Sequence, residues 1–269
     1  MTGRVDMMTE AQPITLITGA SAGIGAALAD EFAKHGHALV LVARREPQLR
    51  TVADAVEARG HPRPRVMTAD LAQPGAADRI EAELRAANLE VQFLVNNAGF
   101  GLVGPAASLP RAEQLTVVDL NARALTELSL RFVDSMARHK GGILNVASLA
   151  GFMPGPGMAV YHATKAYVLS FSEALHQELK ARGVRVTALC PGPVETEFQA
   201  RAGMPSGYFP PMFARSAERV AREGYGGLMA NRRVVVPGSH NHVAALLPRF
   251  LPRGWMLSIM SRYRRGRAP

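Results

Sequence analysis

The chain has 269 residues, 48% of them hydrophobic and 20% charged, so it can bury one sizeable core and one domain is the better expectation. A single cysteine, Cys190, excludes an internal disulfide and fits a reducing compartment, which predicts a cytoplasmic protein. The formal net charge of +9 is concentrated after Glu223, where eight arginines follow without an acidic side chain. The body of the protein is therefore close to neutral, and its charge does not predict nucleic-acid binding.

Short runs rich in Val, Ile and Leu alternate along the chain with longer helical patterns. The first 12 residues lack the apolar core of a signal peptide, and we expect a flexible tail there. Strands are predicted at residues 14–18, 37–43, 64–69, 91–96, 141–147, 184–190 and 232–236. Helices are predicted near 23–36, 46–60, 73–87, 111–138, 158–181 and 216–230. Apolar strands that alternate with helices favour an α/β fold, a doubly wound parallel seven-stranded sheet with helices on both faces.

A glycine-rich turn, Thr18-Gly19-Ala-Ser-Ala-Gly23-Ile-Gly25, joins the first predicted strand to the first helix. Glycines allow a tight turn and close approach of a pyrophosphate, and a helix N-terminus offers free N–H groups. Any strand-to-helix turn can use glycine, but this position in the chain favours a dinucleotide site. Such a site would lie beyond the carboxyl ends of the strands.

Arg44 and Arg45 follow directly after the second predicted strand. Dinucleotide folds place a ribose-reading residue roughly 20 positions after the glycines, acidic for a 2′-hydroxyl and basic for a 2′-phosphate. An arginine can hold a phosphate with two hydrogen bonds. The pair therefore favours NADP(H), the alternative being two solvated arginines at the start of a helix.

Tyr161 and Lys165 are four residues apart in a predicted helix, so both side chains leave the same face. A neighbouring ammonium lowers the pKa of a phenol, and general acid–base help is worth about 10²- to 10⁴-fold in rate. Ser148, at the end of the strand at 141–147, could donate a hydrogen bond to a substrate oxygen. Each feature alone is weak evidence, since most such pairs are ordinary side chains.

Taken together, the motifs resemble the shorter branch of the short-chain dehydrogenase/reductase family over about residues 12 to 240. They are TGASAGIG at 18–25, Asp70-Leu71, Asn96-Asn97-Ala98-Gly99, Asn121, Ser148, Tyr161-x-x-x-Lys165 and Pro191-Gly192. The resemblance implies a Rossmann fold over residues 13–240 and an NADP(H)-dependent oxidoreductase acting on CH–OH or C=O groups. It implies no metal, and a homodimer or homotetramer built from the helices at 111–138 and 158–181.

The resemblance also assigns roles to residues. Tyr161 would be the general acid in reduction and the base in oxidation, while Lys165 would hold the nicotinamide ribose and lower the tyrosine pKa. Ser148 would orient the carbonyl, and Asn121 would fix a water in a proton relay. Asp70 would bond the adenine. The implied cofactor site comprises Gly19, Ser21, Gly23, Ile24, Gly25, Arg44, Arg45, Asp70, Leu71, Asn97, Ala98, Gly99, Tyr161, Lys165, Pro191, Gly192, Val194 and Thr196. One departure is Ala22, where some NADP-using relatives carry a basic residue.

Three segments are candidates for the substrate side, at 100–104, 149–158 and 194–213. Their apolar side chains predict an apolar ketone, aldehyde or secondary alcohol, although the same side chains could simply pack the loops. They are Phe100, Leu102, Phe152, Met153, Met158, Phe198, Met204, Tyr208 and Phe209. A second class of function remains open, a regulatory or scaffold protein that binds NADP without turnover.

A basic extension at 241–269 ends the chain and is predicted to form an amphipathic helix. Its apolar arc comprises Trp255, Met256, Ile259, Met260 and Tyr263, opposite Ser258, Ser261 and Arg265. Such a helix could cover the substrate pocket, pack against another subunit, or make peripheral contact with an anionic membrane. Nucleic-acid binding through this segment ranks low, because no stacked aromatics or recognised module accompany the arginines.

Overall fold

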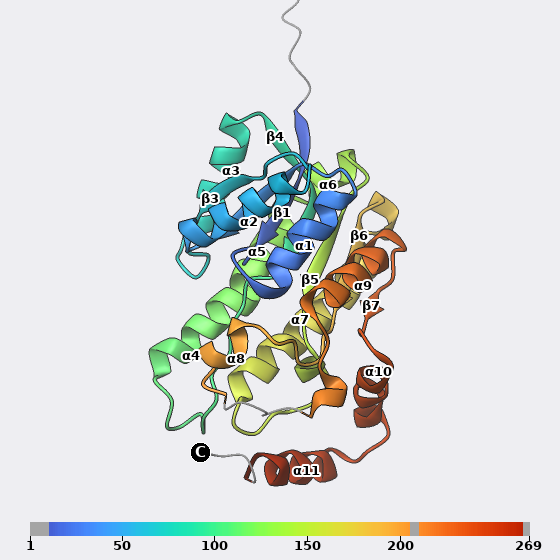
Figure 1. Cartoon of the computed structure of the whole chain (residues 1–269). Helices are drawn as coiled ribbons and strands as arrows, with labels where there is room; N and C mark the ends of the chain where they lie inside the picture. Colours follow the sequence, from blue (N-terminus) through green and yellow to red (C-terminus); the bar gives the residue numbers. More distant parts are fainter. Residues whose placement is uncertain (1–10, 205–209, 266–269) are drawn as a thin grey trace, which may run out of the picture.

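A seven-stranded, fully parallel sheet forms the centre of the molecule, which the computed structural model describes for residues 11–204 and 210–265 (Figure 1). The strands lie side by side in the order β3-β2-β1-β4-β5-β6-β7. Their bounds are Gln12–Thr18 (β1), Leu39–Ala43 (β2), Arg65–Thr68 (β3), Leu89–Asn96 (β4), Gly142–Val146 (β5), Arg185–Leu189 (β6) and Val234–Val235 (β7). The predicted doubly wound Rossmann fold is therefore confirmed, with all seven predicted strands present.

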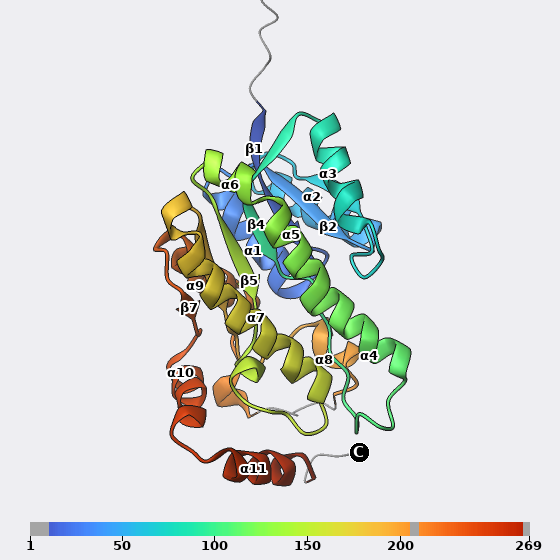
Figure 2. The same cartoon turned by 180° about the vertical axis from the view of Figure 1, so that it is seen from behind.

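Helices cover both faces of this sheet, in two layers with separate apolar cores. The covering helices are α1 (Gly23–Lys34), α2 (Glu46–Ala58), α3 (Ala76–Ala86), α4 (Arg111–Val118), α5 (Leu125–Arg131), α6 (Val133–Arg138), α7 (Ala159–Glu178) and α9 (Ala217–Met229). One core joins the sheet to α1, α2 and α9, and the other joins it to α3, α5, α6 and α7 (Figure 2). Neighbouring strand residues alternate between them, as Leu16 and Ile17 do.

The predicted helix at 111–138 is interrupted twice. A π-helical turn at Asp119–Ala124 separates α4 from α5, and Phe132 leaves helical backbone geometry between α5 and α6. π-turns inside helices occur frequently at functional sites. Here the turn carries Asn121, whose side chain is fully buried.

The order of the strands reverses at β1, which lies between β2 and β4. The carboxyl ends of these strands deliver Thr18, Ala43 and Asn96 to one edge of the sheet. A crevice opens at such a reversal, and ligands of doubly wound sheets bind there. The fold thus places the glycine-rich turn beside Asn97 and the two arginines that follow β2.

The C-terminal extension is helical, as predicted, but it contains two helices. α10 (Ser239–Leu246) runs into a 3₁₀ turn at Leu247–Arg249, and α11 (Arg253–Arg265) follows. Both views show α11 across the lower end of the molecule, next to α10 (Figures 1 and 2). A short helix, α8 (Glu197–Arg201), follows β6 in the chain. Within the part of the chain that the structure describes, no helix is long and apolar enough to cross a bilayer.

Candidate active site

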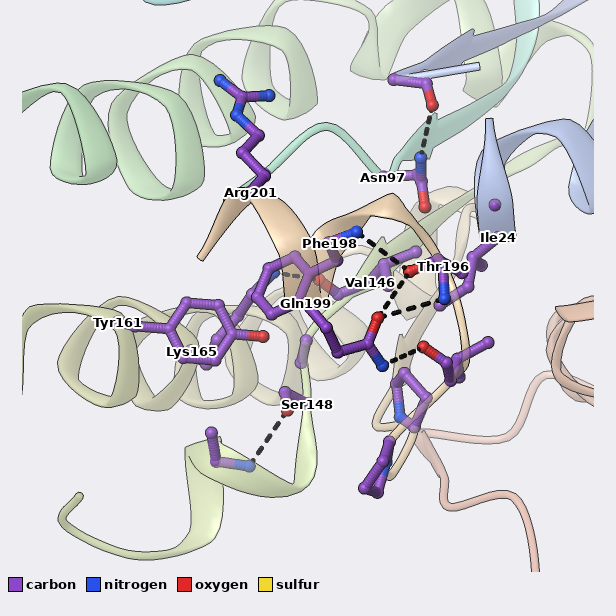
Figure 3. Close-up of a pocket in the computed structure, with 18 of the residues that line it drawn as sticks. Ile24, Asn97, Val146, Ser148, Tyr161, Lys165, Thr196, Phe198, Gln199 and Arg201 are labelled. Atoms are coloured by element: carbon purple, nitrogen blue, oxygen red, sulfur yellow. Dashed lines mark hydrogen bonds between the residues drawn. The ribbon is translucent and has the colours of Figure 1, made fainter. Parts of the chain in front are cut away.

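One cavity of about 520 Å³ lies beyond the carboxyl ends of the strands. Every predicted catalytic and cofactor-binding residue lines it, apart from Gly25, which packs against Gly19, and Asn121, which packs against Gly99. Figure 3 shows part of this lining. Residues that are far apart in the chain, from the turn after β1 to the segment after β6, therefore meet in one place. Among the described residues, no group of histidine, cysteine and acidic side chains could hold a metal ion.

The glycine turn leaves no room for side chains. Gly19 adopts φ +64°, and a Cβ there would lie 2.8 Å from the Cα of Ala98. Gly23 adopts φ +56°, and its Cβ would lie 2.8 Å from a methyl carbon of Thr196. A Cβ on Gly25 would overlap the carbonyl oxygen of Gly19, so this residue packs the turn from behind rather than lining the cavity. Backbone at the turn can consequently come close to a ligand.

Asn97 and Thr18 hold the glycine turn in place. The Asn97 side-chain amide donates to the carbonyl oxygens of Thr18 and Gly19 at 2.9 and 3.0 Å (Figure 3). In return, the Thr18 hydroxyl accepts the backbone N–H groups of Asn97 and Ala98 at 3.0 and 3.1 Å. Thr18 was not predicted as a site residue, although it stands in the motif. Both side chains therefore position the cofactor groove.

Arg44 and Arg45 follow directly after β2, and only one of their two guanidinium groups has an ion-pair partner among the residues described. The Arg45 guanidinium binds Glu197 of α8 at 2.6 Å and reaches the Ser21 hydroxyl at 3.3 Å. Arg44 makes no hydrogen bond or ion pair with any described residue. Burial, and next the charges of Arg44 and Arg45, lower the pKa of Arg201, so positive charge is crowded here.

These features fit a phosphorylated dinucleotide. The turn carries no side chain at Gly19 and Gly23, and α1 begins at Gly23 without a side-chain cap to occupy its free N–H groups. Arg44 carries an unpaired charge, and a bound anion would relieve the crowding of arginines around it. The groove can therefore hold a ligand through its phosphate groups.

The three predicted catalytic side chains lie together at the other end of the cavity (Figure 3). Burial raises the pKa of Tyr161 to about 12, and a hydrogen bond with Ser148 opposes that rise. The Ser148 hydroxyl also accepts the backbone N–H of Ala150 at 3.1 Å, which leaves its own hydrogen free to donate. Tyr161 is thus a neutral phenol at physiological pH, ready to give a proton.

Lys165 is not among the groups that shift the Tyr161 pKa in this structure, so its predicted effect on the tyrosine stays a prediction. Its Nζ donates to the Val146 carbonyl oxygen at 2.7 Å and lies 5.8 Å from the centroid of the Tyr161 ring. Burial lowers the pKa of Lys165 itself to about 8, although the nearby Cys190 opposes this. Burial is therefore the largest cause of the pKa shift of each of the two groups.

Asn121 is a positioning residue in this structure. Its side-chain amide donates to the Phe100 carbonyl oxygen at 2.9 Å and to the Thr164 hydroxyl at 3.1 Å. Its side-chain oxygen accepts the Phe100 N–H at 3.1 Å, so the π-turn fastens the segment after β4 to α7. The predicted water relay remains a prediction, because the side-chain contacts are made with protein groups.

His162 also lines the cavity, and it was not predicted. Its Nδ1 lies 2.8 Å from the Met153 carbonyl oxygen, and burial lowers its pKa. The side chain thereby ties the loop that follows Ser148 to the helix that carries Tyr161. Its place directly after Tyr161 in the sequence is the signal that could have identified it.

The substrate end of the cavity is mostly apolar. Of the predicted side chains, Met153, Met158, Phe198 and Met204 line it. Three others do not: Phe100 is buried under the Arg201 guanidinium, Phe152 packs toward a core cluster, and Leu102 lines a separate small pocket. Tyr208 and Phe209 lie outside the described residues.

The C-terminal extension closes this end of the cavity. Ala244 of α10 and Ile259 and Met260 of α11 line it, together with Phe213 from the segment before α9. On α11, the Met256 side chain is 95% buried, whereas Trp255, from the same predicted arc, is 67% exposed. Of the three fates that the sequence left open, covering the pocket is thus observed. The side chains of Tyr263 and Arg265 lie outside the described part.

Comparisons with known proteins identify the family that the chain is similar to. The family model described as short chain dehydrogenase matches residues 13–205. Sulfoacetaldehyde reductase 2 of Chromohalobacter salexigens is 39% identical over 190 residues, which is 69% of this chain and 74% of that protein. Serine 3-dehydrogenase of Rhizobium radiobacter is 34% identical over 184 residues, covering 68% of this chain and 72% of that one.

Two solved structures extend the likeness to nearly the whole chain. A short-chain dehydrogenase from Sphingobium yanoikuyae, in complex with NADPH, is 33% identical with a TM-score of 0.79, covering 93% of this chain and 95% of that one. An alcohol dehydrogenase from Comamonas testosteroni, specific for bulky-bulky ketones, is 29% identical with a TM-score of 0.73. It covers 96% of this chain and 94% of that one. The likeness thus reaches beyond residue 205, where the family model ends.

Proposed function

The chain belongs to the short-chain dehydrogenase family of oxidoreductases, and from this premise we propose that it transfers a hydride between NADP(H) and an apolar ketone, aldehyde or secondary alcohol. The observation that carries the proposal is the single cavity. At one end stand the bare glycine turn and the unpaired Arg44, and at the other stand Ser148 and Tyr161 beneath an apolar lining.

In carbonyl reduction, bound NADPH supplies the hydride that reaches the carbonyl carbon. The Tyr161 phenol gives its proton to the carbonyl oxygen, whose negative charge develops as the carbon is reduced. Ser148, whose oxygen already accepts from Ala150, has its hydrogen available to donate to that oxygen. The same hydroxyl stabilises the tyrosinate that remains, which regains a proton from solvent before the next turnover.

The substrate class rests on the side chains at the reacting end. Met153, Met204 and Met260 offer flexible, polarizable contacts, which suit a large apolar group better than a charged one. The name of the Comamonas testosteroni enzyme, specific for bulky-bulky ketones, supports the same class. The name of sulfoacetaldehyde reductase 2, by contrast, specifies a small anionic substrate, so sulfoacetaldehyde is the compound that tests the apolar assignment.

A substrate screen with NADPH and NADH tests this proposal. We expect bulky apolar ketones to be reduced with a higher kcat/KM than sulfoacetaldehyde, and with NADPH rather than NADH. Preference for sulfoacetaldehyde would contradict the apolar assignment while leaving the oxidoreductase proposal intact. Loss of turnover with every carbonyl, despite NADPH binding, would favour the regulatory or scaffold alternative.

We also propose that the protein is a cytoplasmic homodimer or homotetramer. Exposed apolar side chains on the helices predicted to form the interface support the assembly. They are Leu115, Val118 and Leu130 on α4 and α5, and Tyr167 on α7. The free, buried Cys190 supports the reducing compartment. Light scattering of the purified chain measures the assembly, and a monomer at all concentrations would contradict it.

Arg44→Ser is expected to weaken NADPH binding by about tenfold, since an exposed charge-assisted hydrogen bond to a phosphate is worth about 1.5 kcal/mol. NADH binding, which involves no 2′-phosphate, is expected to stay unchanged and serves as the internal control. Titration of both nucleotides by fluorescence measures the two dissociation constants. Equal weakening of the two would show that Arg44 does not read the phosphate.

The pH dependence of the two reaction directions is expected to differ. Burial raises the pKa of Tyr161 to about 12, so the phenol keeps its proton at neutral pH. Alcohol oxidation needs the deprotonated form, and its kcat/KM is expected to rise steadily from about pH 7 to about pH 10. Carbonyl reduction uses the protonated form, so its kcat/KM is not expected to rise over that pH range. Flat oxidation kinetics would contradict the role of Tyr161 as the base.

A further inference from the structure

An apolar stripe on the C-terminal extension faces solvent. Val243, Leu246, Leu247 and Phe250 are spaced i, i+3, i+4 and i+7 along α10 and the 3₁₀ turn after it. Their exposed fractions are 64%, 40%, 47% and 81%. Stripes with this spacing normally pack against a core. On α10 it is the opposite side, with Ala245, that is buried, and so the stripe is turned outward.

Trp255 continues this exposed surface onto α11. It is 67% exposed and lies five residues beyond Phe250, while its neighbour Met256 is buried. Figures 1 and 2 both place α10 and α11 next to each other at the end of the molecule where α11 covers the cavity. We call the stripe and Trp255 together the outer apolar surface. Exposed apolar side chains grouped at one end of a folded protein indicate an interaction site.

The charge around the outer apolar surface has one sign. Arg249, Arg253 and Arg262 are exposed, and none of them forms an ion pair with a described residue. The sequence from 224 to 269 contains eight arginines and no aspartate or glutamate. Nothing on this segment can therefore neutralise its own charge.

A second copy of this chain or a lipid bilayer would each cover these apolar side chains, and the charge of the surface favours the bilayer. In a two-fold symmetric contact the same surface meets itself, so the unpaired arginines of one copy would face those of the other without an acid between them. An anionic lipid surface complements the arginines, and its interfacial region accommodates exposed aromatic and aliphatic side chains. We propose that the outer apolar surface docks the protein peripherally on an anionic bilayer.

Docking would also bring the cavity to the membrane. Ile259 and Met260 of α11 line the substrate end of the cavity, on the helix that carries Trp255. An apolar substrate dissolved in the bilayer would therefore leave it next to the cavity. This consequence rests on the proposed function, whereas the docking itself does not and is tested without any substrate.

Trp255 provides the readout, because it is the only tryptophan of the chain. The full chain, mixed with vesicles of phosphatidylcholine and phosphatidylglycerol, is expected to float with them and to shift its tryptophan emission to the blue. Vesicles of phosphatidylcholine alone, or anionic vesicles in high salt, are expected to cause neither effect. Neither flotation nor a shift with anionic vesicles would overturn the proposal.

Two double variants test the surface itself. Leu247→Ser with Phe250→Ser, and Arg249→Gln with Arg253→Gln, are each expected to reduce the floating fraction at least about tenfold. Their matched controls, Leu247→Met with Phe250→Leu and Arg111→Gln with Arg222→Gln, are expected to float like the wild type. Arg111 and Arg222 are exposed arginines elsewhere on the molecule. Equal flotation of the test variants and their controls would contradict docking through this surface.

Size-exclusion chromatography of the same variants tests whether a second copy of the chain covers the outer apolar surface instead of a bilayer. Should a second copy cover the outer apolar surface, Trp255 emission would be blue-shifted without vesicles and would change with protein concentration. Leu247→Ser with Phe250→Ser would then lower the oligomeric state. That combination of results, without vesicle binding, would replace the bilayer by a subunit contact. The kinetics of carbonyl reduction play no part in it, so failure of the proposed function remains distinguishable.

Discussion

Tyr161→Phe is expected to lower kcat for carbonyl reduction by about 10²- to 10⁴-fold, the usual worth of a general acid. The ring keeps its place in the cavity, and only the proton donor is removed. NADPH binding is expected to stay within about twofold of the wild type, because the glycine turn and Arg44 are untouched. Steady-state kinetics with the best apolar ketone, and fluorescence titration of NADPH, measure the two quantities.

Tyr167→Phe is the matched control for this variant. Tyr167 lies on the same helix, is 43% exposed, and its hydroxyl lies 2.8 Å from that of Thr126, outside the cavity. Its loss is expected to leave kcat nearly unchanged. Similar kinetics for the two variants, or a loss confined to NADPH binding in Tyr161→Phe, would contradict the role of Tyr161 as proton donor.

Gly19→Ala is expected to weaken NADPH binding by about 10- to 100-fold, which corresponds to about 1–3 kcal/mol of overpacking. The new Cβ would lie 2.8 Å from the Cα of Ala98, so either the turn or the strand end after β4 must move. Both border the groove proposed for the cofactor. Calorimetric titration of NADPH measures the loss, and thermal unfolding shows whether the fold survives.

Gly36→Ala separates this steric effect from backbone strain. Gly36 has φ +80°, also in the left-handed region, but a Cβ there would meet nothing within 4 Å. Both substitutions therefore pay the strain of about 1 kcal/mol that a side chain brings to this region, and only Gly19→Ala adds a clash. If NADPH binds equally to the two variants, the glycine turn does not form the cofactor groove.

Much of the fold could be predicted because its signals are local. Each strand is a short apolar run, and neighbours such as Leu16 and Ile17 must both be buried in a sheet covered on two sides. The breaks in the helix at 111–138 could not be predicted, because they depend on contacts of Asn121 with Phe100 and Thr164, distant in sequence. Periodicity detects an apolar helix face, but it does not tell whether that face is covered.

The features of the site likewise divide into those that local spacing predicts and those that depend on the folded structure. The glycine turn, Ser148 and Tyr161 stand in recognisable spacings, and the topology brings them together without further information. The ion pair of Arg45 with Glu197 joins residues 152 positions apart, and no local pattern announces it. The pKa values of Tyr161 and Lys165 depend on how deeply each is buried, which spacing along a helix does not reveal.

The structure of the C-terminal extension was predicted only in part. Its helical, amphipathic character was predicted, and Met256 and Met260 of the predicted arc do face the protein. The outward stripe on α10 was not predicted, because the predicted apolar arc comprised only residues between 255 and 263. A segment can thus cover a cavity with one set of apolar side chains and present another to its surroundings.

The most direct test of the account is a single-turnover experiment with the wild-type chain. Enzyme in excess is mixed with NADPH and a bulky apolar ketone, and the loss of reduced-nicotinamide absorbance is followed beside the product by chromatography. We expect one alcohol to be formed for each NADPH oxidised. NADPH that binds but stays reduced with every carbonyl in the panel, at any pH, would show that the cavity holds a nucleotide without performing hydride transfer.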